Sequence, residues 1–434
     1  MAQALSSWED QGCRAVRTGA NNMAAQKLII EGFEAVRFRI PRKGTYHHCA
    51  GTLKHYDGVV LKLHAGGVTG LGELSMLFPD RTGTTPGTAL DIFQNYVAPR
   101  LIGQDALTMG KTWSNLVKLG SDPHAFPYHR AAVDVAVHDL AAKALGVPVH
   151  QLIGEKPISP PQGGMTVGRS ISTAGGSLVP TALQYLANDN YASFTVKGSD
   201  NVDEDVECFR ELREVLGPDF PLEIDPNQAY SVHDAIRVVK ALENDNLAVL
   251  EQPCAWWDME GSAQVQAAAK EVPVVVDEGA ICPWEIRRVA QMKAGRGITL
   301  KVAHGGFTGC SLNYKMAMEH GLFCNVGSKH TMGVGTAAIA HFCAAHPGVY
   351  QPIGYGSPRE RFIDDIIKGG INFHEGRLYV PEGPGLGVEL DEAKLLEYSV
   401  GQRLTVGMVP TPMHLPNIPV PSAGPAMWPA QLHG

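Results

Sequence analysis

The sequence has no basic run and no long apolar run. Its 44 acidic residues outnumber 36 basic ones, giving a formal net charge of -8, so we do not expect nucleic acid as a partner. No stretch approaches the roughly 18 to 20 apolar residues of a membrane span. The first 28 residues also lack the apolar core of a signal peptide. We therefore expect neither a membrane partner nor secretion.

Cysteine motifs are missing as well. The eight cysteines form no CxxC pair and no zinc-ribbon spacing, which indicates free thiols and a cytoplasmic location. The glycine-rich stretch RTGTTPGT lacks the lysine of a P-loop, so it predicts no nucleotide site. What the chain does have is 44% hydrophobic residues and 48 glycines, a composition typical of an α/β enzyme with a packed core.

The expected elements divide the chain into a mixed first part and an alternating second part. Apolar runs between residues 28 and 74 predict a small antiparallel sheet with a hairpin at HAGGVTG, and helical periodicity follows it. Eight apolar runs then alternate with helical stretches, which predicts a (β/α)8-like barrel. The eight runs are GMTVG, SFTVK, PLEID, LAVLE, VPVVVD, GITLK, LFCNV and VYQPI.

These patterns predict five segments. Residues 1–27 form a flexible extension, 28–155 an α+β domain, and 160–355 the barrel. Residues 356–405 return to the first domain, and 406–434 form a proline-rich tail.

Three acids recur at one interval in the barrel segment. Asp225, Glu251 and Asp277 each follow the previous acid by 26 residues, and each ends an apolar run that precedes a helical stretch. One β/α unit needs about this length, so the acids are expected to end three neighbouring parallel strands at the active-site edge of the barrel. An acid that only caps the next helix is the alternative for any one of them.

Two lysines end flanking strands of the same barrel. Lys197 closes SFTVK on the second expected strand and Lys301 closes GITLK on the sixth. Strands four apart in an eight-stranded barrel face each other, so the lysines are expected to oppose one another across the acids. A crowded, cationic site is expected to lower a lysine pKa enough for base catalysis. A snorkelling lysine, or one that only pairs with an acid, is the alternative.

Clustered carboxylates favour a hard divalent cation with oxygen ligands, Mg²⁺ with Mn²⁺ as a substitute. Such a site suits removal of the proton α to a small carboxylate through a metal-stabilised enediolate. Reprotonation by the opposite lysine would give racemisation or epimerisation, and intramolecular addition gives cycloisomerisation. Loss of a β-leaving group would make the protein a dehydratase, and a catalytically inactive binding homologue is a third alternative.

At this point the chain resembles the enolase superfamily, specifically the mandelate racemase and muconate lactonizing enzyme family. The resemblance rests on GGVTGLGE, VDVAVHDLAAKALGVPVHQLIG, DPNQ, LEQP, VVVDE, HGGFTG and VPEGPGLGVELDE. It implies a modified TIM barrel of the (β/α)7β type. It also implies an α+β capping domain built from the N-terminal segment and the C-terminal tail, a small-molecule carboxylate substrate, and a homo-oligomer.

Carried over by position, the resemblance implies that Asp225, Glu251 and Asp277 hold the metal ion, with Asn227 and Glu278 in support. These five residues lie in DPNQ, LEQP and VVVDE.

The lysines also match family positions. Lys197 is similar to the second lysine of the family's KxK motif. Thr195 stands in place of the first lysine, and we expect it to contact the substrate. Lys301 matches the base of the sixth strand, which places the chain closest to the muconate lactonizing subgroup. Gly327 stands where mandelate racemase-like members carry a histidine.

Two segments of this chain correspond to segments that face substrate in the family, and one of them departs from the family's pattern. KHTMGVG replaces MLESSIG, and its His330 and Thr331 are expected to hydrogen-bond a hydroxyl or a second carboxylate. PRKGTYHH matches the capping-domain loop that closes over substrate, so Tyr46, His47 and His48 are expected to contact the distal part of the substrate.

Overall fold

The computed structural model describes residues 27–48, 51–76, 78, 83–108, 110, 112, 124–154, 160–172 and 177–407. The expected extension at 1–27, apart from Lys27, lies outside this part of the chain, as does nearly all of the tail expected at 406–434. The side chains of His47 and His48 also lie outside it, although their backbones end a strand.

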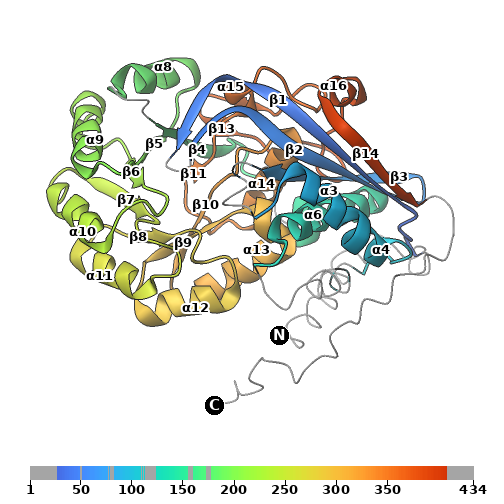
Figure 1. Cartoon of the computed structure of the whole chain (residues 1–434), viewed down its shortest axis with the longest axis horizontal. Coiled ribbons are helices and arrows are strands. Elements are labelled where there is room, and N and C mark those ends of the chain that lie inside the picture. Colours follow the sequence, from blue (N-terminus) through green and yellow to red (C-terminus); the bar gives the residue numbers. More distant parts are fainter. Residues whose placement is uncertain are drawn as a thin grey trace, which may run out of the picture.

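A four-stranded antiparallel sheet forms the capping domain. Its strands are β1 (Gly32–His48), β2 (Gly51–Ala65), β3 (Val68–Met76) and β14 (Ser399–Gly407), in the order β14-β1-β2-β3. The β2–β3 hairpin turns at Gly66 and Gly67, whose φ angles of 55° and 77° suit a two-residue turn in which glycine is favoured. Because β14 pairs with β1, the C-terminal segment returns to the first domain (Figure 1).

Short helices and one long helix cover this sheet. They are α3 (Pro86–Ile92), the π-helix η1 (Phe93–Val97), α4 (Ala98–Leu101), α6 (Pro127–Leu145) and α7 (Val149–Ile153). Helix α6 packs directly on β3, where a Cβ atom at Gly70 or Gly72 would lie 2.2 or 2.0 Å from a carbonyl oxygen of α6. The GGVTGLGE motif thus lets strand and helix approach backbone to backbone.

In the described part of the chain the barrel has eight parallel strands and seven intervening helices, so the predicted (β/α)7β arrangement is confirmed (Figure 1). Seven of the expected strands lie where they were predicted, whereas the eighth is shifted, because β11 shares only Ile353 with the expected run VYQPI. Strand β11 pairs with β4, and the Gly327–Gly354 bridge joins the end of β10 to β11, which closes the barrel. The elements are β4 (Met165–Ile171), α8 (Val179–Asp189), β5 (Ser193–Lys197), α9 (Val202–Leu216), β6 (Leu222–Asp225), α10 (Val232–Ala241), β7 (Leu247–Glu251), α11 (Met259–Ala269), β8 (Val274–Val276), α12 (Pro283–Met292), β9 (Gly297–Leu300), α13 (Val302–Glu319), β10 (Phe323–Val326), α14 (Gly333–Ala345) and β11 (Ile353–Gly354).

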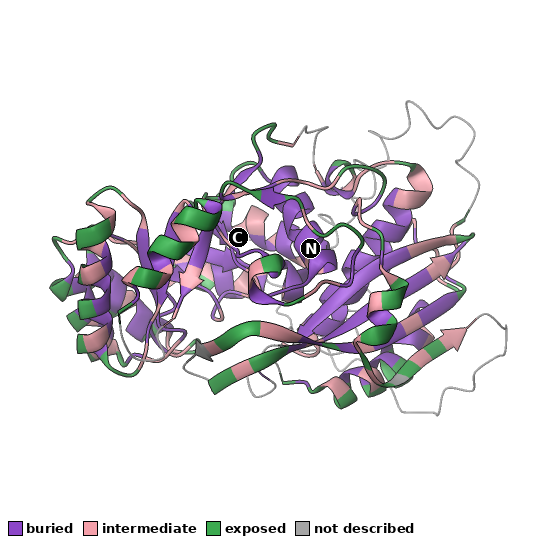
Figure 2. Ribbon diagram, turned by 90° about the horizontal axis from the view of Figure 1, so that it is seen from above, coloured by how far each residue is buried: buried purple, intermediate pink, exposed green. Residues whose placement is uncertain are grey.

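After the barrel the chain runs back along the molecule to the cap. It forms α15 (Pro358–Arg361), β12 (Phe373–His374), β13 (Arg377–Leu378) and α16 (Glu392–Glu397) before β14. Strand β13 pairs with β4, and residues of β1 and β2 such as Phe38 and Tyr56 belong to the same apolar core as the barrel. Figure 2 shows buried positions running through both parts. The cap is therefore packed onto the barrel through a shared core.

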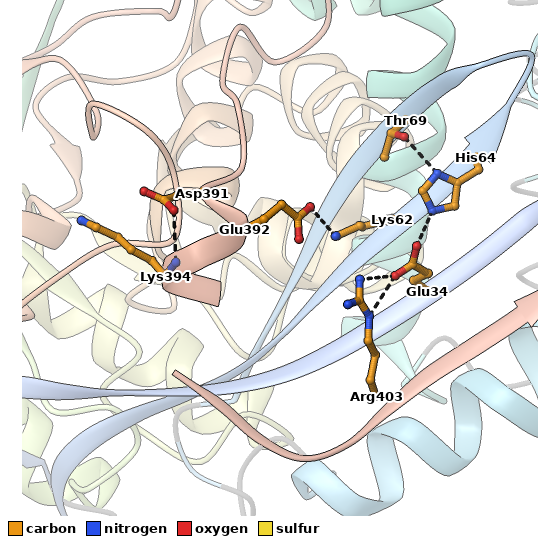
Figure 3. Close-up of polar contacts among 8 residues, drawn as sticks. All are labelled: Glu34, Lys62, His64, Thr69, Asp391, Glu392, Lys394 and Arg403. Carbon is orange, nitrogen blue, oxygen red and sulfur yellow. Dashed lines mark hydrogen bonds and ion pairs between the residues drawn. The ribbon is translucent and has the colours of Figure 1, made fainter. Parts of the chain in front are cut away.

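A polar network on the cap sheet holds the returning segment. Glu34 of β1 accepts from Arg403 of β14 and pairs with His64 of β2, while Lys62 pairs with Glu392 of α16 (Figure 3). Arg403 and His64 lower the pKa of Glu34 although its partial burial opposes this. Among the helices that the structure describes, none is long and apolar enough to cross a membrane.

Candidate active site

The three spaced acids lie together at the carboxyl edge of the barrel. Asp225 ends β6, Glu251 ends β7, and Asp277 directly follows β8. These strands are neighbours in the sheet, and all three side chains are buried. Parallel strands present their carboxyl ends at one edge, so a 26-residue repeat becomes one arc of carboxylates.

The two lysines flank this arc and line one cavity. Lys197 ends β5 and Lys301 follows β9, four strands further round the barrel. Both line a cavity that Asp225 and Glu251 also line. The Lys197 ammonium pairs with Asp225, and the Lys301 ammonium pairs with Asp277.

The expectation of a lowered lysine pKa is not met in this arrangement. Burial on its own would lower the pKa of Lys197, but Asp225, Tyr46 and Glu251 outweigh it and the pKa is raised. The pKa of Lys301 is raised in the same way, since Asp277 and the glutamates beside it outweigh burial. Each lysine is the counter-ion of an acid here.

Glu251 lies between the two ion pairs. Burial raises its pKa to about 8, and the charges of Asp225 and Asp277 add to that rise. The hydroxyl of Thr299 donates to Glu251 Oε1 over 2.7 Å. A nearby cation stabilises the ionised form of a carboxyl that lies among like charges.

No three His, Cys, Asp or Glu side chains in the described part of the chain form a ready-made metal group. Asp225 and Asp277 are each paired with a lysine instead. The donor set still suits a hard cation, because Asp277 Oδ1 and Glu278 Oε2 are buried and have no hydrogen-bond partner among the residues that the structure describes.

Both residues expected to support the acids line the cavity. Asn227 donates its backbone N–H to Asp225 Oδ1 over 2.9 Å, with a φ angle of 47°, and Glu278 stands on the opposite side of the arc. Gln252 adds a support that sequence reasoning missed. Its side-chain oxygen accepts from the backbone N–H of Asp277 and of Gly279 over 2.9 and 3.1 Å, which ties β7 to β8.

The candidate substrate contacts divide into two groups. Tyr46, Thr195 and His330 line the cavity, and the rings of Tyr46 and His330 meet edge to face at 4.5 Å. Thr331 is not among the lining residues, which differs from the expectation: it is buried beside α14, 3.4 Å from the hydroxyl of Thr336. The expectations for the side chains of His47 and His48 lie outside the described residues.

Several lining residues were missed by sequence reasoning. Glu223 accepts from Thr195 over 2.9 Å, and burial raises its pKa to about 7. Residues two apart on a strand share a face, so Glu223 before Asp225 and Thr195 before Lys197 follow from the strand assignments alone. The other missed lining residues are Phe78, Ser170, Asn325, Ser328, Lys329, Gly354 and Arg361.

Gly327 leaves room for Lys301. A Cβ atom at this position would lie 3.0 Å from Lys301 Cε and 3.0 Å from Thr299 Cγ2. A side chain where mandelate racemase-like members carry a histidine would therefore press on the lysine in this chain.

The two parts of the chain match two family models. Residues 34–154 match the mandelate racemase / muconate lactonizing enzyme N-terminal domain, and residues 177–394 match the enolase C-terminal domain-like model. The chain belongs to the mandelate racemase / muconate lactonizing enzyme family of the enolase superfamily. The resemblance inferred from its motifs is thereby confirmed.

Relatives in this family are enzymes with several reactions. The chain is 28% identical to muconate cycloisomerase 1 of Rhodococcus opacus, covering 75% of this chain and 86% of the relative. It is 25% identical to the N-succinyl-L-Arg/Lys racemase of Bacillus cereus, covering 86% and 99%. A cis-3-hydroxy-L-proline dehydratase of Roseibium aggregatum is 27% identical, covering 80% and 92%.

Solved structures of family members share the fold. The N-succinyl Arg/Lys racemase from Bacillus cereus matches with a TM-score of 0.80 at 24% identity, covering 87% of this chain and 100% of the other. A muconate lactonizing enzyme from Pseudomonas fluorescens matches with a TM-score of 0.78 at 23% identity, covering 86% and 100%. At these identities the structures support the capping domain and the barrel.

Proposed function

We propose that this family member removes the proton α to the carboxylate of a small molecule and returns a proton to the same intermediate, as a racemase, epimerase or cycloisomerase. The observation that carries the proposal is the pair of lysines on β5 and β9, Lys197 half-buried and Lys301 buried, which line one cavity from positions four strands apart. A substrate between them would present one face to each ammonium. Lys197 and Lys301 are then the proton carriers for opposite faces. Mg²⁺ held by the acids would compete with each ammonium for Asp225 and Asp277, and this would favour the neutral lysine that can take a proton.

The remaining residues of the edge have assignable roles. Asp225, Glu251 and Asp277 would hold Mg²⁺. Its positive charge would stabilise the negative charge that develops on the substrate carboxylate. Gln252 keeps Asp277 in register with β7 through the two backbone N–H groups that it binds. Asn227 holds Asp225 from the other side of the arc. Thr195 and Glu223 are hydrogen-bonded to each other and line the cavity together with Lys197.

A dehydratase is the second candidate, because the first step is the same and a related family member is named a cis-3-hydroxy-L-proline dehydratase. In that reaction one lysine takes the α-proton and the other lysine, or His330, delivers a proton to the departing hydroxyl. The two reactions diverge after the first proton transfer and so give different products from one cavity.

The test is incubation of the purified chain with Mg²⁺ and a library of carboxylates in D₂O, with NMR detection of α-deuterium. A racemase or epimerase incorporates deuterium and inverts the centre, whereas a dehydratase releases water and forms an enol or keto acid. For a racemase, Lys197→Ala and Lys301→Ala each abolish inversion and each still exchange the proton of one enantiomer. Activity near wild type in both variants contradicts the assignment of the lysines, and no exchange with any carboxylate supports an inactive homologue.

A further inference from the structure

Three arginines gather at the end of the cavity that faces β4 and β11. Arg169 belongs to β4, Arg361 to α15, and Arg42 to the part of β1 that reaches over the barrel. Strands β4 and β11 lie across the barrel from β7 and β8, which carry the central acids. The arginines and the acids therefore occupy opposite walls of the barrel mouth.

The guanidinium groups lie close together. A Cβ atom at Gly356 would be 2.3 Å from Arg169 Nη1 and 2.6 Å from Arg361 Nη2, so these two groups meet across one glycine. Burial lowers the pKa of Arg361 to about 9, and the charges of Arg169 and Arg42 add to this effect. Arg42 responds in the same way, with its pKa lowered to about 10 by burial and by Arg169. Burial would also lower the pKa of Arg169, but Tyr185, Tyr191 and Glu360 outweigh it and the pKa is raised. Arg42 and Arg361 therefore lie in a desolvated place beside a cation that stays charged.

Little negative charge faces them in the part of the chain that the structure describes. Glu360 lies 3.6 Å from Arg169 Nε, and it also accepts from the hydroxyl of Tyr191. Burial raises the pKa of Glu360 to about 7, so its charge is itself suppressed near neutral pH. The phenol of Tyr185 accepts from Arg169 over 3.0 Å but brings no charge.

Arg361 lines the cavity and has a buried donor without a partner among the described residues. It is 5% exposed, its Nη1 is buried without a hydrogen-bond partner among the described residues, and it lines the same cavity as Lys197 and Lys301. Buried donors and buried cations are normally paired, because an unpaired one destabilises the folded protein, and more so when it is charged. An anion bound in the cavity would pair with Arg361 and offset part of the positive charge of the cluster.

We propose that Arg361, supported by Arg169 and Arg42, binds a second carboxylate of the substrate, so that the enzyme acts on dicarboxylates. A guanidinium suits a carboxylate because it offers two parallel N–H donors. His330, between β10 and α14 of the barrel, completes the subsite with its Nδ1 3.4 Å from Arg42 Nη1. The inference rests on the proposed function, since it places the reacting carboxylate at the acids and the second one at the arginines.

Calorimetric binding in the presence of Mg²⁺ tests this assignment with defined probes. The probes are glutarate and adipate, each compared with its monoamide, which keeps one carboxylate and replaces the other by a neutral group of the same size. At least one dicarboxylate is expected to bind wild type about tenfold or more tightly than its monoamide, the loss expected for one charge-assisted contact. In Arg361→Met this preference is expected to disappear while the monoamide affinity stays within about threefold.

Arg359→Met is the matched control, because Arg359 belongs to the same helix, is 70% exposed and pairs with Asp189. It is expected to keep the preference for the dicarboxylate. Equal binding of dicarboxylates and monoamides by wild type overturns the proposal. A preference that survives in Arg361→Met also overturns it, and would mean that Arg361 only balances charge inside the fold.

A second variant covers a failure of Arg361→Met to fold. Gly356→Ala keeps all three arginines but places a methyl group between Arg169 and Arg361, so it is expected to weaken dicarboxylate binding selectively. Unchanged binding in a folded Gly356→Ala protein counts against the subsite. Since the assay needs no turnover, a missing preference alongside α-deuterium exchange refutes the subsite alone, and a preference without any exchange refutes the proposed reaction alone.

Discussion

Lys197 and Lys301 stand four strands apart and each is paired with a different acid, Asp225 and Asp277. Glu251 lies between the two pairs and is bound by Thr299 instead of a lysine. The active edge is therefore built as two lysine–aspartate pairs around one central glutamate. This arrangement separates the two faces of a substrate and leaves the central carboxyl to share in binding a cation.

Binding of Mg²⁺ should be measurable without any substrate. A ligand that binds the folded state at about 100 times its Kd stabilises it by about 2.7 kcal/mol, so saturating Mg²⁺ is expected to raise the Tm of chelator-treated protein. Asp277→Asn should reduce this rise, because it replaces a carboxylate whose Oδ1 has no partner among the described residues by a neutral amide. Thermal unfolding of both proteins with and without Mg²⁺ checks this.

Asp219→Asn is the control for that experiment, since Asp219 is exposed in the α9–β6 connection, which leads to the amino end of β6 and not to its carboxyl end. It should respond to Mg²⁺ like wild type. An equal rise of Tm in Asp277→Asn would exclude Asp277 as a ligand.

Gly327→Ala is expected to slow proton exchange with little loss of stability. The added methyl group meets Lys301 Cε and Thr299 Cγ2 at 3.0 Å, so the lysine must shift by a few tenths of an ångström. Misplacement of a reacting group by about 1 Å can cost 100-fold, and we expect at least a tenfold lower rate of deuterium incorporation here. Gly87→Ala, where the nearest atom is 3.9 Å away, should keep the wild-type rate.

A wild-type exchange rate in Gly327→Ala would mean that Lys301 tolerates a different position or does not carry the proton. A large fall of Tm would instead show that the site of substitution is important for folding.

The capping domain holds the segment that carries His330 through one carboxylate. Glu73 of β3 accepts from the backbone N–H of Met332 and Gly335 at the start of α14, over 2.7 and 2.8 Å, and from the hydroxyl of Tyr56. Glu73→Gln presents an amide N–H₂ to these donors and leaves a buried one unsatisfied. We expect a loss of about 2 kcal/mol or more in urea unfolding.

Glu389→Gln serves as the comparison, because Glu389 is 73% exposed and pairs with Lys368 at the surface. Its substitution should change stability by no more than about 0.5 kcal/mol. If the two variants lose the same amount, Glu73 does not join cap to barrel as described.

The strand ends of the site were predictable from the sequence because they depend only on spacing along the chain. Asp225, Glu251 and Asp277 close apolar runs at a repeat of one β/α unit, and the same reasoning found Lys197 and Lys301. The closed barrel with its returning C-terminal strand was also predictable, from eight apolar runs and the family motifs.

Features that depend on distances between remote segments were not predictable. One example is the arginine cluster, whose members Arg42, Arg169 and Arg361 come from three separate parts of the chain. They come together only in the folded protein, where β1 of the cap packs on the barrel. The lysine pKa shifts were expected in the opposite direction, because their sign depends on how closely each ammonium approaches an acid. Thr331 differs because the chain turns into α14 directly after it, which takes its side chain away from the cavity.

His129 of α6 is an acid-sensitive group inside the capping domain. Its ring lies 4.9 Å from Phe93 and 5.8 Å from Phe126, and both ring nitrogens are buried without hydrogen-bond partners among the described residues. Burial, aided by Arg130, lowers its pKa to about 3. Below about pH 6.5 the unfolded chain therefore binds a proton at this residue that the folded chain does not, so stability is lost as the pH falls from there towards 3.

His129→Phe removes this proton-binding difference and the two unsatisfied nitrogens together. We expect it to be more stable than wild type by about 1 kcal/mol at neutral pH, and the gap to widen by up to about 1.4 kcal/mol for each pH unit below 6.5. Urea unfolding of both proteins at several pH values between neutral and 5 measures the gap. A difference that stays constant over that range would show that His129 is protonated in the folded protein, or that water reaches its ring through the Phe93 and Phe126 contacts.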